Sequence, residues 1–178
     1  MISMVINADR SARKTFVGMV FIKIGTGIIT LWGAINIYFF SHLRNHGTEI
    51  TNNTNSLMLL GAMIPSTVSA LFSTRLTKAY GYQTVIRICS VIFALSPLMI
   101  NIVINKFVVA LCYLFIPITC FGISSIPVLN CIWSQFPKDL NKISGAAILF
   151  FSLGSIIWNI VFTAIINPNN DPAVIDNS

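Results

Sequence analysis

Charged residues are scarce in this sequence of 178 residues, since Lys, Arg, Asp and Glu together make up 9% of it. An average soluble domain contains about 25% charged residues. With 55% hydrophobic residues, the chain has too few polar groups to cover a globular surface. This composition excludes a soluble enzyme. It also excludes disorder, which needs few apolar residues. The sequence therefore predicts an integral membrane protein.

Catalytic and metal-binding constellations are also missing. The five acidic residues fall in predicted loops and tails, so no pair of carboxylates occurs at helical spacing inside a predicted span. We interpret the four cysteines as small buried hydrophobic residues, because they lack the spacing of metal ligands or of a disulfide scaffold. His42 and His46 are four residues apart, but only Glu49 could add a third ligand. The sequence predicts no enzyme, no metal and no cofactor.

Five apolar runs are long enough to cross a membrane as helices, which takes roughly 20 residues each. Inside lipid, helices satisfy every backbone polar group within the segment. The sequence thus predicts an all-α membrane protein with a basic N-terminal segment (1–15), a five-helix transmembrane domain (16–166) and a polar tail (167–178). The predicted helices cover residues 16–40, 57–74, 84–104, 107–133 and 143–166.

The basic residues predict an orientation. Of the 11 Lys and Arg residues, only Arg44 and Lys106 fall on the side opposite the N-terminus when the chain crosses five times. Cytoplasmic loops carry the excess of Lys and Arg, so the N-terminus is expected on the cytoplasm-equivalent side and the C-terminus on the opposite one. This bias also accounts for the net charge of +6 without nucleic-acid binding.

Lys23 is the one charge inside the first apolar run, and two interpretations stay open. If the membrane boundary lies near residues 18–21, its long side chain snorkels to the basic side, and residues 24–40 still span. Alternatively it is an intramembrane cation that binds a substrate carboxylate, which is the usual meaning of a charge inside a span. We expect the snorkelling arrangement.

Other polar side chains within the spans need partners, either on a neighbouring helix or in a wet cavity. The residues considered for substrate or cavity contact, with Lys23, are Thr30, Trp32, Asn36, Asn130 and Asn159. Small residues at helical spacing permit close contact between membrane helices. The predicted packing residues are Ala62, Ser66, Ala70 and Thr74 in the second helix, with Gly145 and Gly154 in the fifth.

Three stretches carry a family resemblance. The first, LWGAINIYFFSHLR, contains Trp32-Gly33 and Tyr38. The second, WSQFPKDLNKISGAAILFFSLGSIIWNIVFTAIINPNN, contains the elements Phe136-Pro137, Ser144-Gly145, Gly154 and Asn167-Pro168. The third is a loop after the second helix, which runs from Arg75 through Lys78 to Arg87 and has Gly81 at the glycine of the family's signature. Together they resemble carriers of the major facilitator superfamily, of the oxalate/formate antiporter and monocarboxylate porter type.

The resemblance covers the first five of twelve helices expected in such a carrier. Lys78 stands at the acidic position of the signature loop, and Tyr82 and Gln83 stand at two basic ones. Thr30 and Ser125 occupy positions where the family has aromatics that cage a small carboxylate.

The resemblance implies the first half of a small organic-anion carrier that does not transport alone, because transport needs two bundles rocking about a midplane site. The alternative is a non-transporting structural or accessory subunit of a larger membrane complex. The expected partners are the lipid bilayer and other membrane-protein chains, either a second carrier half or subunits of that complex.

Overall fold

The computed structural model describes residues 8–33, 36, 38, 40, 52–101, 108 and 110–166. This part of the chain is helical almost throughout and contains no strand, which confirms the all-α prediction for it. Its elements are α2 (Arg10–Thr26), η1 (Gly27–Leu31), α4 (Asn52–Tyr80), α5 (Tyr82–Leu95), η2 (Ser96–Asn101), η3 (Ala110–Phe115), α7 (Ile116–Gln135) and α8 (Leu140–Ile166).

Four of the helical segments are long and apolar enough to cross a membrane, which fits a multi-pass membrane protein. They are Arg10–Leu31, Ser56–Tyr80, Leu111–Gln135 and Leu140–Ile166. The run predicted at 84–104 forms a shorter apolar helix, Tyr82–Leu98, and its last residues lie outside the described part. A fifth span therefore stays a prediction.

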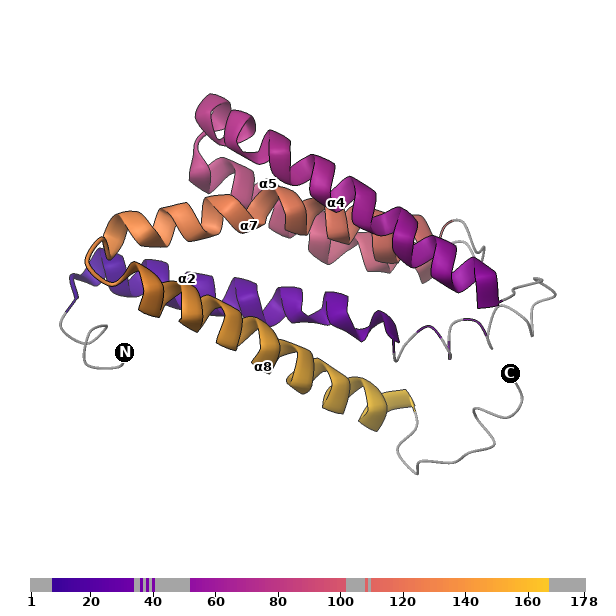
Figure 1. The fold of residues 1–178 in the computed structure, drawn as a ribbon. Helices are drawn as coiled ribbons and strands as arrows, with labels where there is room; N and C mark the ends of the chain where they lie inside the picture. Colours follow the sequence, from indigo (N-terminus) through magenta and orange to yellow (C-terminus); the bar gives the residue numbers. More distant parts are fainter. Residues whose placement is uncertain are drawn as a thin grey trace.

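Consecutive long helices run in opposite directions across the view of Figure 1 and form two neighbouring groups. One group is α2 with α8, and the other is α4 with α5 and α7. Helix α7 joins them, because it contacts α4 and α5 on one side and α2 on the other. Lys23 and the cavity described below lie along these contacts.

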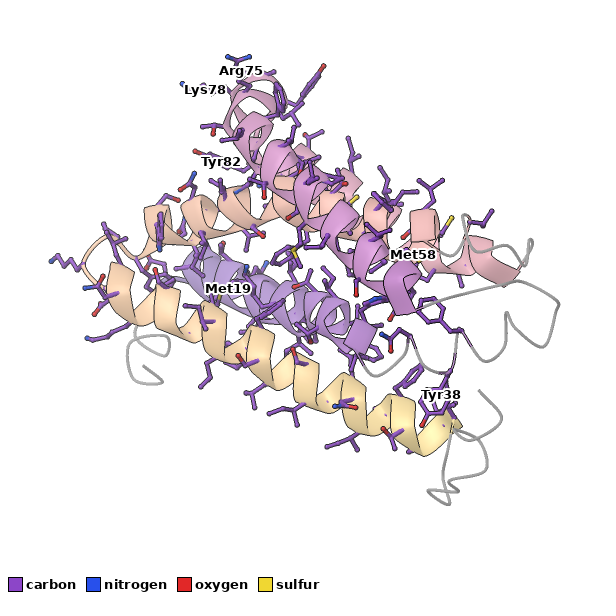
Figure 2. The ribbon with its side chains drawn as sticks, turned by 45° about the vertical axis from the view of Figure 1, so that its right-hand side comes forward. Met19, Tyr38, Met58, Arg75, Lys78 and Tyr82 are labelled. Atoms are coloured by element: carbon purple, nitrogen blue, oxygen red, sulfur yellow. The ribbon has the colours of Figure 1, made fainter. Side chains whose placement is uncertain are left out.

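Basic residues gather at one end of the bundle. The start of α2, the end of α4 and the turn between α7 and α8 all lie at this end (Figure 1). Figure 2 shows Arg75 and Lys78 at this end of α4, with Met58 near the other. The basic residues of these three segments are Arg10, Arg13, Lys14, Arg75, Lys78, Lys138 and Lys142. We name this region the basic end.

The turn at the basic end is short because proline stops one helix and an aspartate precedes the next. Pro137 disfavours helical geometry at Phe136, whose N–H still donates to the Ile132 carbonyl at 3.1 Å. Asp139 accepts the Ile143 N–H at 3.0 Å and its carboxylate pairs with Lys142 at 2.7 Å. These contacts fold α8 back along α2.

Helices extend beyond the apolar runs that predicted them. Helix α2 begins at Arg10 rather than at residue 16, and its first N–H donors include Arg13, which donates to the Asp9 carbonyl at 3.0 Å. Helix α4 continues to Tyr80, so the signature loop expected after the second helix is reduced to Gly81. Polar side chains do not end a helix when they reach water, so the apolar runs underestimate helix length.

Gly81 separates α4 from α5 in a conformation that other residues rarely adopt, with φ 80° and ψ 155°. We expect Gly81→Ala to lower the free energy of unfolding by about 1–3 kcal/mol, because a side chain at this φ and ψ is strained. Thermal unfolding in detergent micelles, followed by circular dichroism, measures the change. The matched control is Gly18→Ala within α2, where no atom lies within 4 Å of an added Cβ and alanine favours helix.

Serines make the contact between α4 and α7. The Ser69 hydroxyl donates to the Thr119 carbonyl at 3.2 Å, and the Ser73 hydroxyl donates to the Ile123 carbonyl at 2.6 Å. A Cβ added at Gly122 would lie 2.5 Å from the Ser66 carbonyl oxygen, so the two backbones pass too closely for any side chain there. Small residues and hydroxyl groups thus hold this pair of helices together.

Within this chain, the stripe predicted on α4 is buried at its start and exposed at its end. Ala62 is fully buried, but Ala70 is only partly buried and Thr74 is exposed. A strict four-residue spacing rotates by about 40° per step around a helix of 3.6 residues per turn. After three steps Thr74 has left the interface, which continues through Ser69 and Ser73 instead.

Glycines make the contact between α2 and α8. A Cβ added at Gly27 would lie 2.6 Å from the Gly154 carbonyl carbon, and one at Gly154 would lie 2.7 Å from the Ile24 Cα. Gly154 therefore packs directly against the backbone of α2. Gly145 is exposed with nothing within 4 Å of an added Cβ, so within this chain it makes no close helix contact. Nine residues separate the two glycines, which places them on opposite helix faces.

Candidate functional site

Lys23 is buried in the middle of the bundle. Its side chain is 7% exposed. Its ammonium nitrogen lies 5.6 Å from the ring centroid of Phe121 on α7, which is a cation–π distance. The Phe121 ring in turn stacks on Phe151 of α8 at 5.6 Å between centroids. The lysine thus lies where α2, α7 and α8 meet.

The start of α2 leaves both interpretations of Lys23 open. Helix α2 begins at Arg10, but polar residues continue a helix into water, so its first residue does not mark the membrane boundary. The described structure shows that Lys23 is buried beside Phe121. The snorkelling arrangement stays a prediction.

No described carboxylate neutralises Lys23. Asp9 and Asp139 are the acidic residues in the described part, and its one ion pair joins Asp139 to Lys142. Glu49, Asp171 and Asp176 lie outside the described residues. A buried ammonium group without a counter-ion is costly. Within the described part of the chain, Lys23 therefore has a cation–π contact but no counter-ion.

The backbone around Lys23 is held by hydrogen bonds. The Thr26 hydroxyl donates to the Lys23 carbonyl at 3.1 Å. The Trp158 indole N–H of α8 donates to the Ile24 carbonyl at 3.0 Å. These bonds fix one turn of α2 against α8, so the position of the lysine is set by rigid helices.

Thr30 and Trp32 belong to helix contacts rather than to the surroundings of Lys23. The Thr30 hydroxyl lies 2.6 Å from the Ser155 hydroxyl of α8 and 2.7 Å from the Gly27 carbonyl. Trp32 is buried in a second apolar cluster, where its ring lies 5.7 Å from that of Tyr113 and 6.0 Å from that of Phe40.

The three asparagine candidates are not brought together. Asn36 is buried, and within the described part of the chain its Oδ1 atom has no hydrogen-bond partner. Asn130 is partly buried in α7, and Asn159 is exposed on α8. Of the candidates other than Lys23, none is shown in contact with it.

The signature-loop residues lie apart from Lys23. Arg75 and Lys78 are exposed near the end of α4, and Arg87 is exposed on α5. The Arg75 guanidinium carbon lies 5.9 Å from the ring centroid of Phe72 on its own helix. These cations form no ion pair with the described carboxylates. Their positions fit the aqueous ends of helices.

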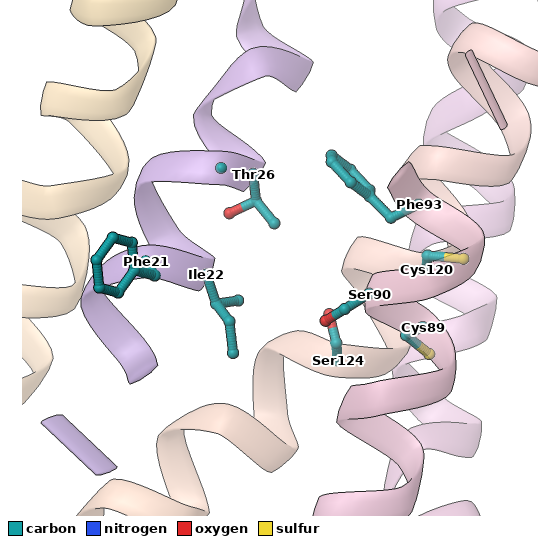
Figure 3. Close-up of a pocket in the computed structure, with 9 residues that line it drawn as sticks. Phe21, Ile22, Thr26, Cys89, Ser90, Phe93, Cys120 and Ser124 are labelled. Carbon is teal, nitrogen blue, oxygen red and sulfur yellow. The ribbon is translucent and has the colours of Figure 1, made fainter. Parts of the chain in front are cut away.

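A cavity of about 250 Å³ lies between α2, α5 and α7. Sequence reasoning missed it, because none of the candidate residues lines its wall. The lining includes Thr26 from α2, Cys89, Ser90 and Phe93 from α5, and Cys120 and Ser124 from α7 (Figure 3). Cysteine and serine within apolar runs are ordinary packing residues, so the cavity is recognisable only once the helices are packed together.

Metal ligands of the usual kind do not gather in the described part, where no group of three or more His, Cys, Asp and Glu side chains occurs. His42 and His46, the pair considered from the sequence, lie outside the described residues.

Comparison with models of known protein families gives no match, and comparisons with curated proteins and with solved structures also give none. The function therefore rests on Lys23, its neighbours and the sequence resemblance described above.

Proposed function

We propose that this chain forms the first half of a membrane carrier for small organic anions of the monocarboxylate or oxalate/formate type. The observation that carries the proposal is the buried Lys23 ammonium group, which faces Phe121 and has no described carboxylate beside it. An intramembrane cation marks a substrate or ion pathway by default. The resemblance of the Trp32-Gly33 and Phe136-Pro137 stretches to such carriers adds support.

In this proposal the carboxylate of the substrate pairs with Lys23 at mid-membrane. Phe121 stabilises the ammonium while the site is empty, and the apolar surroundings strengthen the ion pair once it forms. The helices of this chain do not transport alone, because alternating access needs a second bundle on the other side of the site. The basic end faces the cytoplasm-equivalent side.

Anion binding by the purified chain tests the site. We expect formate or oxalate to bind the chain in detergent micelles, and Lys23→Ala to weaken that binding at least tenfold, because the substrate loses its counter-ion. Isothermal titration calorimetry measures the affinity. The matched control is Lys78→Ala, which removes an exposed lysine at the basic end and should leave binding unchanged. Equal binding by the Lys23→Ala chain contradicts the proposed site.

Exchange of labelled anions in liposomes tests separately the prediction that this chain does not transport alone. The pure chain in liposomes should bind but not exchange labelled formate or oxalate. Saturable exchange by the pure chain would show that these helices transport without a second bundle.

A second candidate function, a structural or accessory subunit, is favoured by one face of α8. Asn159 and Ser152 are exposed on this helix, seven residues apart and therefore on the same side. An amide exposed to lipid is unfavourable, whereas membrane helices use such groups to bind one another. Native gel electrophoresis of the source membrane separates the candidates, because a large stable complex of many chains contradicts the carrier and supports the subunit.

A further inference from the structure

Three basic side chains lie on the exposed side of α2 near its start. Arg10, Arg13 and Lys14 are exposed, and with Val17 they line an open hollow of about 480 Å³ at the surface. The first turn of α2 contains no acidic residue, and Asp9 before it forms no ion pair within the described part of the chain. The hollow therefore carries a positive charge that no described carboxylate pairs with.

The basic hollow continues into an apolar stripe on the same face of α2. The stripe consists of Val17 and Phe21, whose side chains are 49% and 72% exposed, and of Gly25, where no atom lies within 4 Å of an added Cβ. At 3.6 residues per turn, Arg10, Lys14 and these three residues fall within about 80° around the helix axis. Charged positions and then apolar ones thus follow one another along a single line away from the basic end.

The start of α2 lies level with the polar turn between α7 and α8. The Phe16 ring packs against the Phe136 ring, with 6.5 Å between their centroids. Phe136 immediately precedes the turn, where Lys138 and Lys142 are exposed. A lipid-exposed turn does not occur within hydrocarbon. Lys14, two residues before Phe16, is therefore expected at the level of the lipid headgroups.

The stripe leads to the half-open cavity of about 250 Å³ between α2, α5 and α7. Phe21, Ile22 and Gly25 of α2 line this cavity together with Phe93 of α5, and its wall is largely apolar (Figure 3). Lys14 and Gly25 are eleven residues apart, which is about 16 Å at 1.5 Å per residue. One leaflet supplies about 15 Å of hydrocarbon, which is half of the ~30 Å core. An acyl chain whose headgroup lies at Lys14 therefore reaches the cavity.

We propose that this face of α2 binds one anionic phospholipid from the leaflet at the basic end. The lipid phosphate lies in the hollow between Arg10, Arg13 and Lys14, and one acyl chain follows Val17 and Phe21 into the cavity. Arginine binds phosphate oxygens through paired hydrogen bonds, and lysine binds them as a point charge. A soluble phosphate would use the cations alone, whereas a lipid also covers the apolar stripe. The orientation of the chain accounts for basic residues at this end, but not for their alignment with the stripe and the cavity.

Lipid retention by the purified chain tests the headgroup contacts. The chain is kept in detergent micelles with equal amounts of phosphatidylglycerol and phosphatidylcholine that have the same acyl chains, and native mass spectrometry counts the retained lipid. We expect one phosphatidylglycerol per chain, preferred at least tenfold over phosphatidylcholine. The double variant Arg10→Gln/Lys14→Gln should lower this preference at least tenfold. The matched control Arg75→Gln/Lys78→Gln removes one arginine and one lysine from the basic end on α4 and should keep it.

A larger side chain in the stripe tests the acyl-chain contact. Gly25→Leu should weaken binding of dioleoyl phosphatidylglycerol at least fivefold, because the leucine fills the open space between the stripe and the cavity. Dihexanoyl phosphatidylglycerol has chains too short to reach Gly25, so it should bind the variant and the wild type equally. The control is Gly145→Leu, at a position on α8 where an added Cβ also meets open space.

Equal retention of the two lipids by the wild-type chain overturns the proposal, and this measurement does not require any variant to fold. Equal losses in the two double variants also overturn it, because the overall charge of the basic end would then attract lipid without a site. Displacement of the lipid by inorganic phosphate, but not by chloride at the same ionic strength, would assign the hollow to a soluble anion instead. None of these results depends on formate or oxalate binding at Lys23.

Discussion

Gly154→Val is expected to prevent α8 from packing on α2. The added Cβ alone would contact the Ile24 carbonyl oxygen and lie 2.7 Å from its Cα, well inside ordinary carbon–carbon contact of about 3.5–4.0 Å. These atoms belong to the backbone of a helix, so they cannot move aside as a side chain would. We expect the free energy of unfolding to fall by about 3 kcal/mol or more, at the upper end for overpacked contacts. Detergent denaturation followed by circular dichroism measures the loss.

Gly145→Val is the matched control for this variant. It makes the same substitution in the same helix, at an exposed position where nothing lies within 4 Å of an added Cβ. Valine is a slightly better helix former than glycine, so this variant should be as stable as the wild type. If both variants lose equal stability, the valine side chain disturbs α8 itself and the close contact with α2 is not the cause.

Lys23→Leu is expected to stabilise the chain while it removes anion binding. A buried ammonium group without a carboxylate costs free energy. Even buried ion pairs can be replaced by apolar side chains with a gain of about 1–4 kcal/mol in favourable cases. Thermal unfolding should therefore occur at a higher temperature in the variant than in the wild type when no anion is present.

Added formate should raise the unfolding temperature of the wild type but not that of the Lys23→Leu chain. An anion that binds only the folded state stabilises it by about 2.7 kcal/mol at one hundred times its dissociation constant. The wild-type unfolding temperature should rise with formate, whereas that of the Lys23→Leu chain should not. Lys78→Leu should respond to formate as the wild type does. A Lys23→Leu chain that is less stable than the wild type would mean that the lysine serves the fold.

Composition was sufficient to predict the fold class. The scarcity of charge and the apolar runs predict membrane helices, and four of the described helices have the necessary length and hydropathy. The ends of the helices were not predictable in the same way. Hydropathy falls where polar residues begin. Arg10 and Lys78 are nevertheless helical, because polar side chains at the basic end do not interrupt a helix.

Rotation about each helix axis decides which small residues make these contacts. Gly145 and Gly154 belong to the same small-residue pattern, yet one is exposed and the other contacts α2. Ser69 and Ser73 replace Ala70 and Thr74 in the contact with α7. A pattern of small residues shows that some face is packed, but the partner helix decides which one.

Contacts between distant segments could not be predicted from one sequence. Cys89 and Cys120 lie 31 residues apart on separate helices, and their spacing carries no signal. Lys23 was recognised as unusual, but its environment depends on Phe121 of α7. The sequence identified Lys23 as a charge within an apolar run, but it did not predict which side chains surround it.

The sequence separation of two contacting helices sets how long the first waits for the second during synthesis. The α4–α7 hydrogen bonds join residues 50 apart, whereas Ser155 contacts the Gly27 carbonyl across 128 residues. At about 5–20 residues per second, the first contact waits about 3–10 s for its partner to be made, and the second waits about 6–26 s. During that interval Gly27 and the adjoining turn of α2 lack the α8 residues that cover them. Biogenesis of this protein is therefore expected to be most vulnerable before α8 leaves the ribosome.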